Sequence, residues 1–176
     1  NYESLWRWSI GEIEAFYETI WQFGKVISHT PYSQVLDKRT MPGARWFEGA
    51  TLNYTEHALR HAANPGAVNT PAIIFQSEIV PRAEVSWGEL VAKVAALAAT
   101  LRQLGVQPGD RVAILAKNST DYFEFEFACI KMGAMMLPLN WRLAEPELLF
   151  ILNDAEAKGL IYDAEFDERI PALVAN

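Results

Sequence analysis

Hydrophobic residues recur with two different periods along this chain. From residue 87 to 104 they return every three or four positions, which predicts an amphipathic helix whose buried face carries Leu90, Val94, Leu97 and Leu101. Shorter, nearly continuous apolar runs predict strands at 72–76, 80–85, 111–116, 134–139 and 159–162. A further helix is expected over residues 144–154. Helices that alternate with apolar strands are typical of a parallel sheet covered on both faces, so the fold class expected from residue 71 onward is α/β.

The segment from Tyr122 to Phe127 gives conflicting signals. Its aromatic and acidic residues alternate with a period of two, as in a half-buried strand. A parallel sheet needs a crossover here, however, and Asn118 or Ser119 is a suitable helix cap. We therefore expect a helix that runs to about residue 132, with an apolar face formed by Phe123, Phe127 and Ile130.

Aromatic residues are concentrated before about residue 63, including Trp6, Trp8, Phe16, Tyr17, Trp21, Tyr32, Trp46, Phe47 and Tyr54. Ser9 and Glu12 have the spacing of a capping box, and apolar residues at helical spacing follow as far as Gly24. We expect the aromatic residues to form a core; a ligand pocket is the alternative.

A second N-terminal helix is expected from a cap at Thr51 or Asn53 to about Ala63. Residues 64–71 are rich in Asn, Pro and Gly and form the clearest linker. The expected domains are therefore a helical cap with its linker over residues 1–70, and a partial α/β domain over residues 71–176.

Composition excludes several classes of protein. The chain has 176 residues, with 15 Lys and Arg against 22 Asp and Glu and a net charge of −7, which argues against a dedicated nucleic-acid binder. Its longest apolar runs fall well short of the roughly 20 residues of a membrane span. No secretory leader opens the chain, so a cytoplasmic location is expected. Its only cysteine, Cys129, excludes an intrachain disulfide.

The residues alone give no complete catalytic constellation. Neither glycine-rich phosphate-binding pattern is present, and the glycines at 88, 105, 109 and 133 stand alone at expected turns or helix ends. His57 and His61 have a spacing that suits one metal ion, but no third ligand is evident, and two polar residues on an exposed helix face are favoured. Cys129 is expected to be a buried, unreactive thiol.

An acid–base group could in principle be formed by three acidic residues, Asp121, Glu124 and Glu126. They are expected on different faces of one helix. A contact with the helix dipole is favoured for the first, and partner or surface contacts for the others.

Several segments resemble the adenylate-forming acyl-CoA synthetases. Tyr2–Ile10 and Met41–Tyr54 are similar to the N-terminal cap of acetoacetyl-CoA synthetases. Val85–Leu90, Leu104–Val112 and Lys131–Asn140 resemble short core motifs of the superfamily. The resemblance covers nearly the whole chain.

The resemblance changes along the chain. Up to about residue 112 it is closest to acetoacetyl-CoA synthetases. Beyond residue 118, segments such as Asn140–Leu143 and Lys158–Asp163 look more like medium- and long-chain acyl-CoA synthetases. The acyl substrate is therefore open between acetoacetate and a fatty acid.

The resemblance implies a two-step reaction that uses a small-molecule carboxylate, ATP, Mg²⁺ and CoA. In the family, the residues that grip the phosphates and the catalytic lysine follow later in sequence. Within residues 1–176 we therefore expect no catalytic, cofactor-binding or metal residue, and a scaffold that is inactive alone. Arg169 lies near the arginines that meet CoA phosphates in short-chain synthetases, but their pair is not reproduced, so a solvated surface residue is expected.

The preferred interpretation is the N-terminal fragment of an acetoacetate–CoA ligase-like enzyme, since the chain starts without Met and stops soon after a strand. A fragment of a medium- or long-chain fatty acyl-CoA ligase is the first alternative. A freestanding, non-catalytic α/β binding or oligomerisation module is the second.

Overall fold

The computed structural model describes residues 1–78 and 80–174. Contacts divide the chain into two compact units, Asn1–His57 and Ala58–Asn176. The division into domains at residue 70, which was expected from composition, stays a prediction. Within the described ranges, no helix has the length and apolar character needed to cross a membrane.

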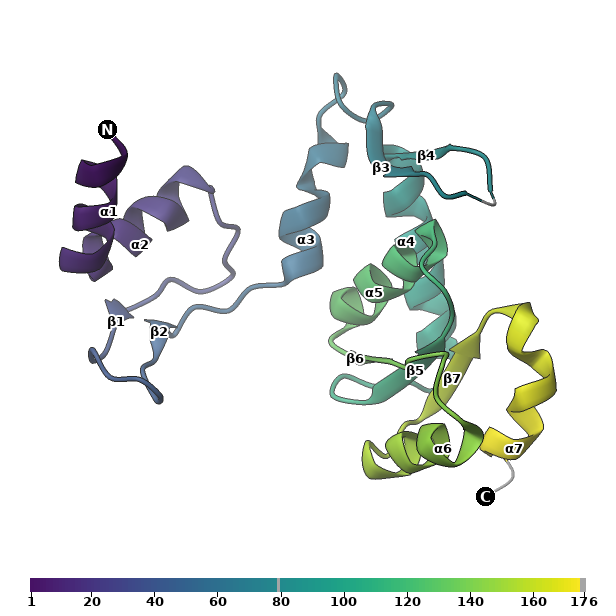
Figure 1. The fold of residues 1–176 in the computed structure, drawn as a ribbon. Helices are drawn as coiled ribbons and strands as arrows, with labels where there is room; N and C mark the ends of the chain where they lie inside the picture. The colour runs from purple at the N-terminus through teal and green to yellow at the C-terminus, as the bar shows by residue number, and fades with distance from the viewer. Residues whose placement is uncertain (79, 175–176) are drawn as a thin grey trace. The chain divides into compact units, whose positions relative to one another are not determined.

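The first unit combines helices with a small hairpin (Figure 1). Helix α1 (Tyr2–Gly11) is followed directly by α2 (Ile13–Phe23). Strands β1 (Gln34–Leu36) and β2 (Trp46–Glu48) pair antiparallel. Helix α3 (Tyr54–Leu59) begins at the end of this unit.

The capping box expected at Ser9 is wrong. Residues 2–11 are already helical, so the Ser9 hydroxyl donates to the Trp6 carbonyl one turn earlier (2.8 Å). Glu12 instead precedes α2 and makes no side-chain cap bond. The expected helix end at Gly24 is confirmed, and so is the cap by Asn53, whose Oδ1 accepts the Glu56 amide at 3.1 Å.

Aromatic rings make the core of the first unit, as expected. The rings of Trp21 and Phe47 stack with centroids 4.4 Å apart, and Tyr32 meets both rings edge-on at 5.3 Å. Every residue of α1 and α2 is described by the structure, and none of them is fully buried. The unit is therefore held by half-buried aromatic contacts.

The second unit starts with the 3₁₀ turn η1 (Arg60–Ala63) and a hairpin of β3 (Pro71–Phe75) and β4 (Ala83–Ser86). Helix α4 (Trp87–Gln103) follows, and Ser86 and Glu89 form a capping box at its start. The remaining elements are β5 (Arg111–Leu115), α5 (Thr120–Met132), β6 (Met135–Pro138), α6 (Glu145–Asp154), β7 (Gly159–Tyr162), η2 (Ala164–Arg169) and α7 (Ile170–Val174).

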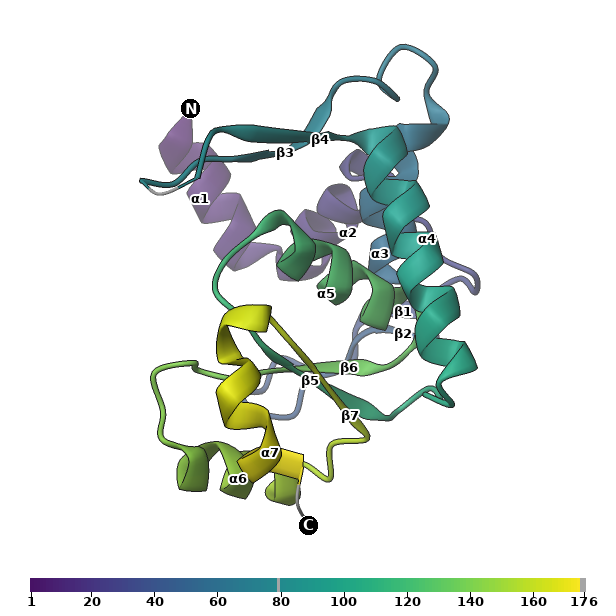
Figure 2. The ribbon, with the colours of Figure 1, turned by 90° about the vertical axis from the view of Figure 1, so that its right-hand side faces the viewer.

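The last three strands form a parallel sheet in the order β6-β5-β7. Side chains of β5 alternate between two cores because successive residues of a strand point to opposite faces. Val112 and Ile114 join the core with α4 and α5, while Ala113 and Leu115 join the core with α6. Figure 2 shows α4 and α5 on one side of the sheet and α6 on the other. The expected α/β fold with a doubly covered parallel sheet is confirmed.

The ambiguous segment after residue 118 is a helix, as preferred. Of its expected apolar face, Phe127 packs half-buried against the core, but the fully buried residues lie elsewhere. The buried apolar residues of α5 are Phe125, Ala128, Cys129 and Met132. Phe123 is 46% exposed. Gly133 ends the helix with φ at 80°, a left-handed conformation that suits glycine. Its carbonyl accepts the Gly109 amide at 2.8 Å, which confirms that both glycines shape turns.

Candidate functional site

A cleft of about 710 Å³ lies at the carboxyl ends of the parallel strands. Lys117 follows β5, Trp141 and Arg142 follow β6, and Asp163 and Glu165 follow β7. The β3–β4 hairpin supplies another wall through Phe75, Gln76, Ser77 and Val80. In open α/β sheets, ligands bind in the crevice outside the carboxyl ends of the strands, so this is the candidate site.

Two cations share the ring of Trp141. The guanidinium of Arg142 lies 4.1 Å from the ring centroid, and the ammonium of Lys117 lies 5.0 Å from it. Lys117 also forms an ion pair with Glu165. The cluster therefore joins all three strand ends, and its exposed Arg142 offers a planar, charged surface for stacking and for anions.

Helix α5 begins at the same cleft. The Ser119 hydroxyl accepts the Tyr122 amide at 3.3 Å, so this serine acts as the N-cap. The positive end of the helix dipole thus adds to the positive charge of Lys117 and Arg142. No described residue of the cleft is a cysteine or histidine, and Ser119 is engaged as a cap. The cleft therefore combines two cations, the carboxylates of Asp163 and Glu165 and the start of α5, and Arg142 is its exposed cation.

A second cavity of about 570 Å³ shares Ser119 and Asp163 with the cleft. On its wall, the Lys93 ammonium donates to buried Glu124 at 2.7 Å. This hydrogen bond raises the pKa of Lys93 above its ordinary value. Asp121 lines the same cavity, so the expectation that these acids occupy separate faces is wrong for Asp121 and Glu124. Positions 121 and 124 are one helical turn apart, which brings them together.

Arg169 is not a solvated surface residue, contrary to expectation. Its side chain is 21% exposed. It donates to the carbonyls of Trp141 (2.8 Å) and Leu143 (2.5 Å) and to the Glu145 carboxylate (2.8 Å). The guanidinium turns inward because the loop after β6 presents these acceptors in a group.

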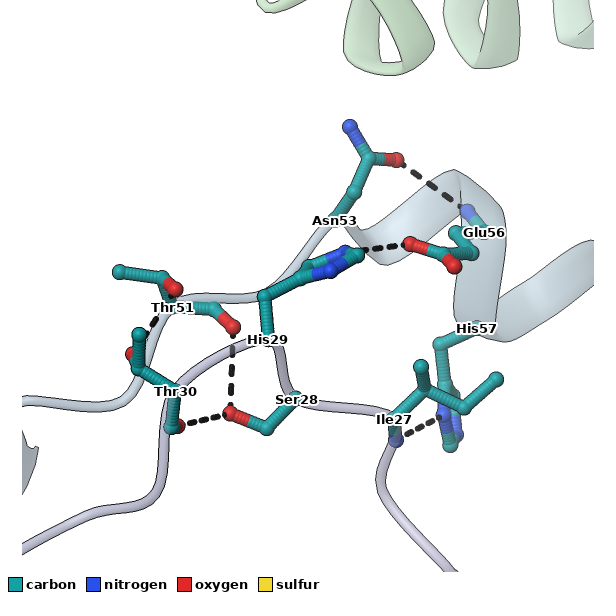
Figure 3. Close-up of polar contacts among 8 residues, drawn as sticks. All are labelled: Ile27, Ser28, His29, Thr30, Thr51, Asn53, Glu56 and His57. Atoms are coloured by element: carbon teal, nitrogen blue, oxygen red, sulfur yellow. Dashed lines mark hydrogen bonds and ion pairs between the residues drawn. The ribbon is translucent and has the colours of Figure 1, made fainter.

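The histidines occupy separate environments. His29 Nε2 lies 2.7 Å from a Glu56 carboxylate oxygen, and His57 Nδ1 accepts the Ile27 amide at 3.2 Å (Figure 3). The ring of His61 packs 5.0 Å from that of Trp87. His57 is half-buried, whereas His61 is exposed on η1, so the expected exposed position is confirmed for His61 and wrong for His57. Across the described ranges, no three His, Cys, Asp or Glu side chains group as a metal site needs.

Cys129 is fully buried, as expected. Burial raises the pKa of its thiol to about 12, so the reactive thiolate is scarce at neutral pH. The expectation of a structural thiol is confirmed.

Comparison with known proteins gives the family. A model of the AMP-binding enzyme matches residues 59–175, and a model of the acetyl-coenzyme A synthetase N-terminus matches residues 2–58. The chain belongs to the AMP-binding enzyme family. The sequence resemblance to adenylate-forming acyl-CoA synthetases is thereby confirmed.

Relatives of this AMP-binding enzyme chain are similar over different extents. Acetoacetyl-CoA synthetase from Macaca fascicularis is 34% identical over 84% of this chain and 21% of its own length. The structure of acetoacetyl-CoA synthetase from Streptomyces lividans is 34% identical over 96% of this chain and 27% of that chain, with a TM-score of 0.86. A Mycobacterium tuberculosis fatty acyl CoA synthetase is 36% identical over 53% of this chain and 19% of that one, with a TM-score of 0.51.

The chain therefore spans about a fifth of the length of the curated relatives it matches. The sequence predicted no site residue, which stays a prediction, and it did not single out the cluster of Lys117, Trp141 and Arg142. A signal was present, because Lys117 and Arg142 follow strands that the pattern already placed side by side in a parallel sheet.

Proposed function

We propose that the protein carrying this chain is an ATP-dependent ligase that joins acetoacetate to CoA. The observation that supports this most is the similarity to the Streptomyces lividans acetoacetyl-CoA synthetase over 96% of the chain. In the first step, a carboxylate oxygen bonds to the α-phosphorus of ATP as the bond to pyrophosphate breaks. In the second, the CoA thiol loses its proton, its sulfur bonds to the acyl carbon, and AMP leaves.

Within this reaction, the chain supplies a scaffold and one substrate-binding surface. The cleft at the strand ends seats the phosphorylated adenine nucleotide of ATP or of CoA. Arg142 suits a planar base or a phosphate, and Lys117 and the start of α5 add positive charge. Mg²⁺ would balance the phosphate charge in the whole enzyme; this chain, across its described residues, groups no ligand set to hold it.

The test is ATP–pyrophosphate exchange by the full-length protein with acetoacetate, acetate, octanoate and palmitate. We expect the highest kcat/KM with acetoacetate. Exchange with none of the four acids, by a folded protein, would refute the proposal and favour a non-catalytic module.

A fatty acyl-CoA ligase is the second candidate. It is supported by the similarity of half the chain to the Mycobacterium tuberculosis fatty acyl CoA synthetase. A preference for octanoate or palmitate over acetoacetate in the same assay would select it.

A further inference from the structure

The loop from Leu139 to Ala144 carries the aromatic and the exposed cation of the cleft, so its conformation sets where they lie. Two short contacts within the loop form a turn: the Asn140 side chain accepts the Arg142 amide at 3.1 Å, and its carbonyl accepts the Leu143 amide at 3.0 Å. These bonds shape the turn but do not tie it to the sheet or to the last helices.

The Leu139 amide ties the start of the loop to β5 by donating to the Ile114 carbonyl at 3.0 Å. Arg169 provides the tie to the last helices. It stands at the end of η2, far along the chain, and its Nη1, Nη2 and Nε reach Trp141 O, Leu143 O and Glu145 Oε1. The two carbonyls belong to alternate loop residues, and the carboxylate to the first residue of α6. The rigid, planar guanidinium of an arginine can donate to three acceptors spaced in this way, whereas the single ammonium of a lysine cannot reach all of them.

The same element also touches the ring. Phe166, buried in η2, lies 6.3 Å from Trp141 between ring centroids. Arg169 itself does not line the cleft. It therefore acts on the cleft through the loop, by fixing the backbone from which Trp141 and Arg142 project.

We propose that Arg169 is a positioning residue, which holds the loop after β6 so that Trp141 and Arg142 face the nucleotide of the substrate. This inference rests on the proposed role of the cleft. It assigns to Arg169 an inward contact with the loop and no contact with a phosphate.

Arg111 offers a matched control. Its guanidinium also meets two carbonyls and a carboxylate, those of Ala155 (2.6 Å), Gly109 (3.4 Å) and Glu156 (2.8 Å). Its side chain is 31% exposed, close to the 21% of Arg169. It lies at the amino end of β5, the opposite end of the strand from the cleft.

The experiment compares Arg169→Lys with Arg111→Lys in the full-length protein. Labelling with 5-fluorotryptophan gives a ¹⁹F resonance for Trp141, assigned by its loss in Trp141→Phe. We expect Arg169→Lys to shift or broaden this resonance and to raise the KM for one nucleotide substrate roughly tenfold, with kcat within about twofold. Arg111→Lys should change neither. Unchanged resonance and KM in Arg169→Lys, or equal changes in both variants, would overturn the inference.

Two further variants keep the outcomes distinct. KM values for ATP and for CoA are measured separately in Lys117→Ala and Trp141→Ala, and the substrate whose KM rises is the one in the cleft. If neither KM rises, the proposal that the cleft binds a nucleotide substrate is refuted. A Trp141 resonance that moves in Arg169→Lys and not in Arg111→Lys would still support the contact between Arg169 and the loop. If Arg169→Lys does not fold, Glu145→Gln replaces it, because this variant alters one of the three contacts. We expect a smaller shift of the Trp141 resonance in Glu145→Gln. An unshifted Trp141 resonance would contradict the inference.

Discussion

The pair of Lys93 and Glu124 illustrates how one buried charge depends on its partner. Glu124 is 10% exposed in its side chain and Lys93 is 49% exposed. Removing the lysine leaves a buried carboxylate without its cation, which costs more than removing both charges.

For Lys93→Met we therefore expect the local free energy of opening of α4 and α5 to fall by about 1–2 kcal/mol, a value discounted for the solvent around the lysine. Hydrogen exchange of amides in the two helices measures it. Adding Glu124→Gln should restore part of the loss. A double variant that opens more easily than Lys93→Met would contradict this account.

A second residue-scale prediction concerns Glu14. Hydrogen bonds from Arg39 (2.5 and 3.0 Å) and from its own backbone lower the pKa of this carboxyl from 4.5 to about 2. Because the folded pKa is depressed, the contribution to stability is complete above about pH 4.5 and is lost as the pH falls through about 2.

The measurement is a ¹³C titration of the Glu14 carboxyl by NMR. We expect a midpoint near pH 2, and a return toward the ordinary value in Arg39→Met. A wild-type midpoint near 4.5 would show that the contact does not hold in solution.

At the scale of elements, the glycine turns connect the helices to the sheet. A Cβ at Gly133 would lie 3.3 Å from the Pro108 side chain, and φ is 80° there. Gly105 ends α4 with φ at 91° and has nothing within 4 Å of such an atom. Both positions strain an L-residue, but only the first also crowds a neighbour.

Gly133→Ala should therefore cost more than Gly105→Ala, with about 1–2 kcal/mol expected for the conformational strain alone. The free energy of opening, taken from exchange of amides in the last turns of α5 and α4, gives the two values. Equal losses would mean that Pro108 moves aside without cost.

The sequence predicts an element well when the contacts that determine it lie within the element, and poorly when they come from distant parts of the chain. Strands β3 to β7 and α4 were predictable because burial repeats with the period of the element itself. The short strands β1 and β2 were not predicted. The face of α5 was not, because its aromatic–acidic alternation is local, whereas burial of Phe125 is decided by the sheet beneath it. The capping box at Ser9 failed for a similar reason, since α1 already extends across it.

The candidate site was the least predictable part. Arg169 is 28 residues from the carbonyl of Trp141 that it binds, and no local pattern encodes that contact. The cluster at the strand ends depends on strand order, which places the residues after β5, β6 and β7 together. Family resemblance indicated the reaction but assigned no residue of this chain to it.

At the scale of the molecule, we expect a polypeptide of residues 1–176 to have no adenylating activity. In the family that the chain resembles, the residues that grip the phosphates and the catalytic lysine follow later in sequence, so these residues alone are expected to act as a scaffold. Pyrophosphate release from ATP, measured with the panel of carboxylates used for the full-length protein, should stay at background. Turnover above background would contradict the scaffold role.

The same polypeptide should also self-associate. In the described part of the sheet, β6 and β7 each have one unpaired edge, and open edges promote pairing between chains. Sedimentation velocity should show oligomers that grow with concentration. A monomer with a sharp, cooperative thermal transition would exclude this behaviour.

The strand order has a consequence for biosynthesis. The central strand β5 leaves the ribosome before either of its neighbours, and β7 starts only at residue 159. At a typical elongation rate of about 5–20 residues per second, its apolar side chains and its backbone hydrogen-bonding groups stay without a complete set of partners for several seconds. Slower translation before residue 159 would lengthen this interval and increase the demand for chaperones.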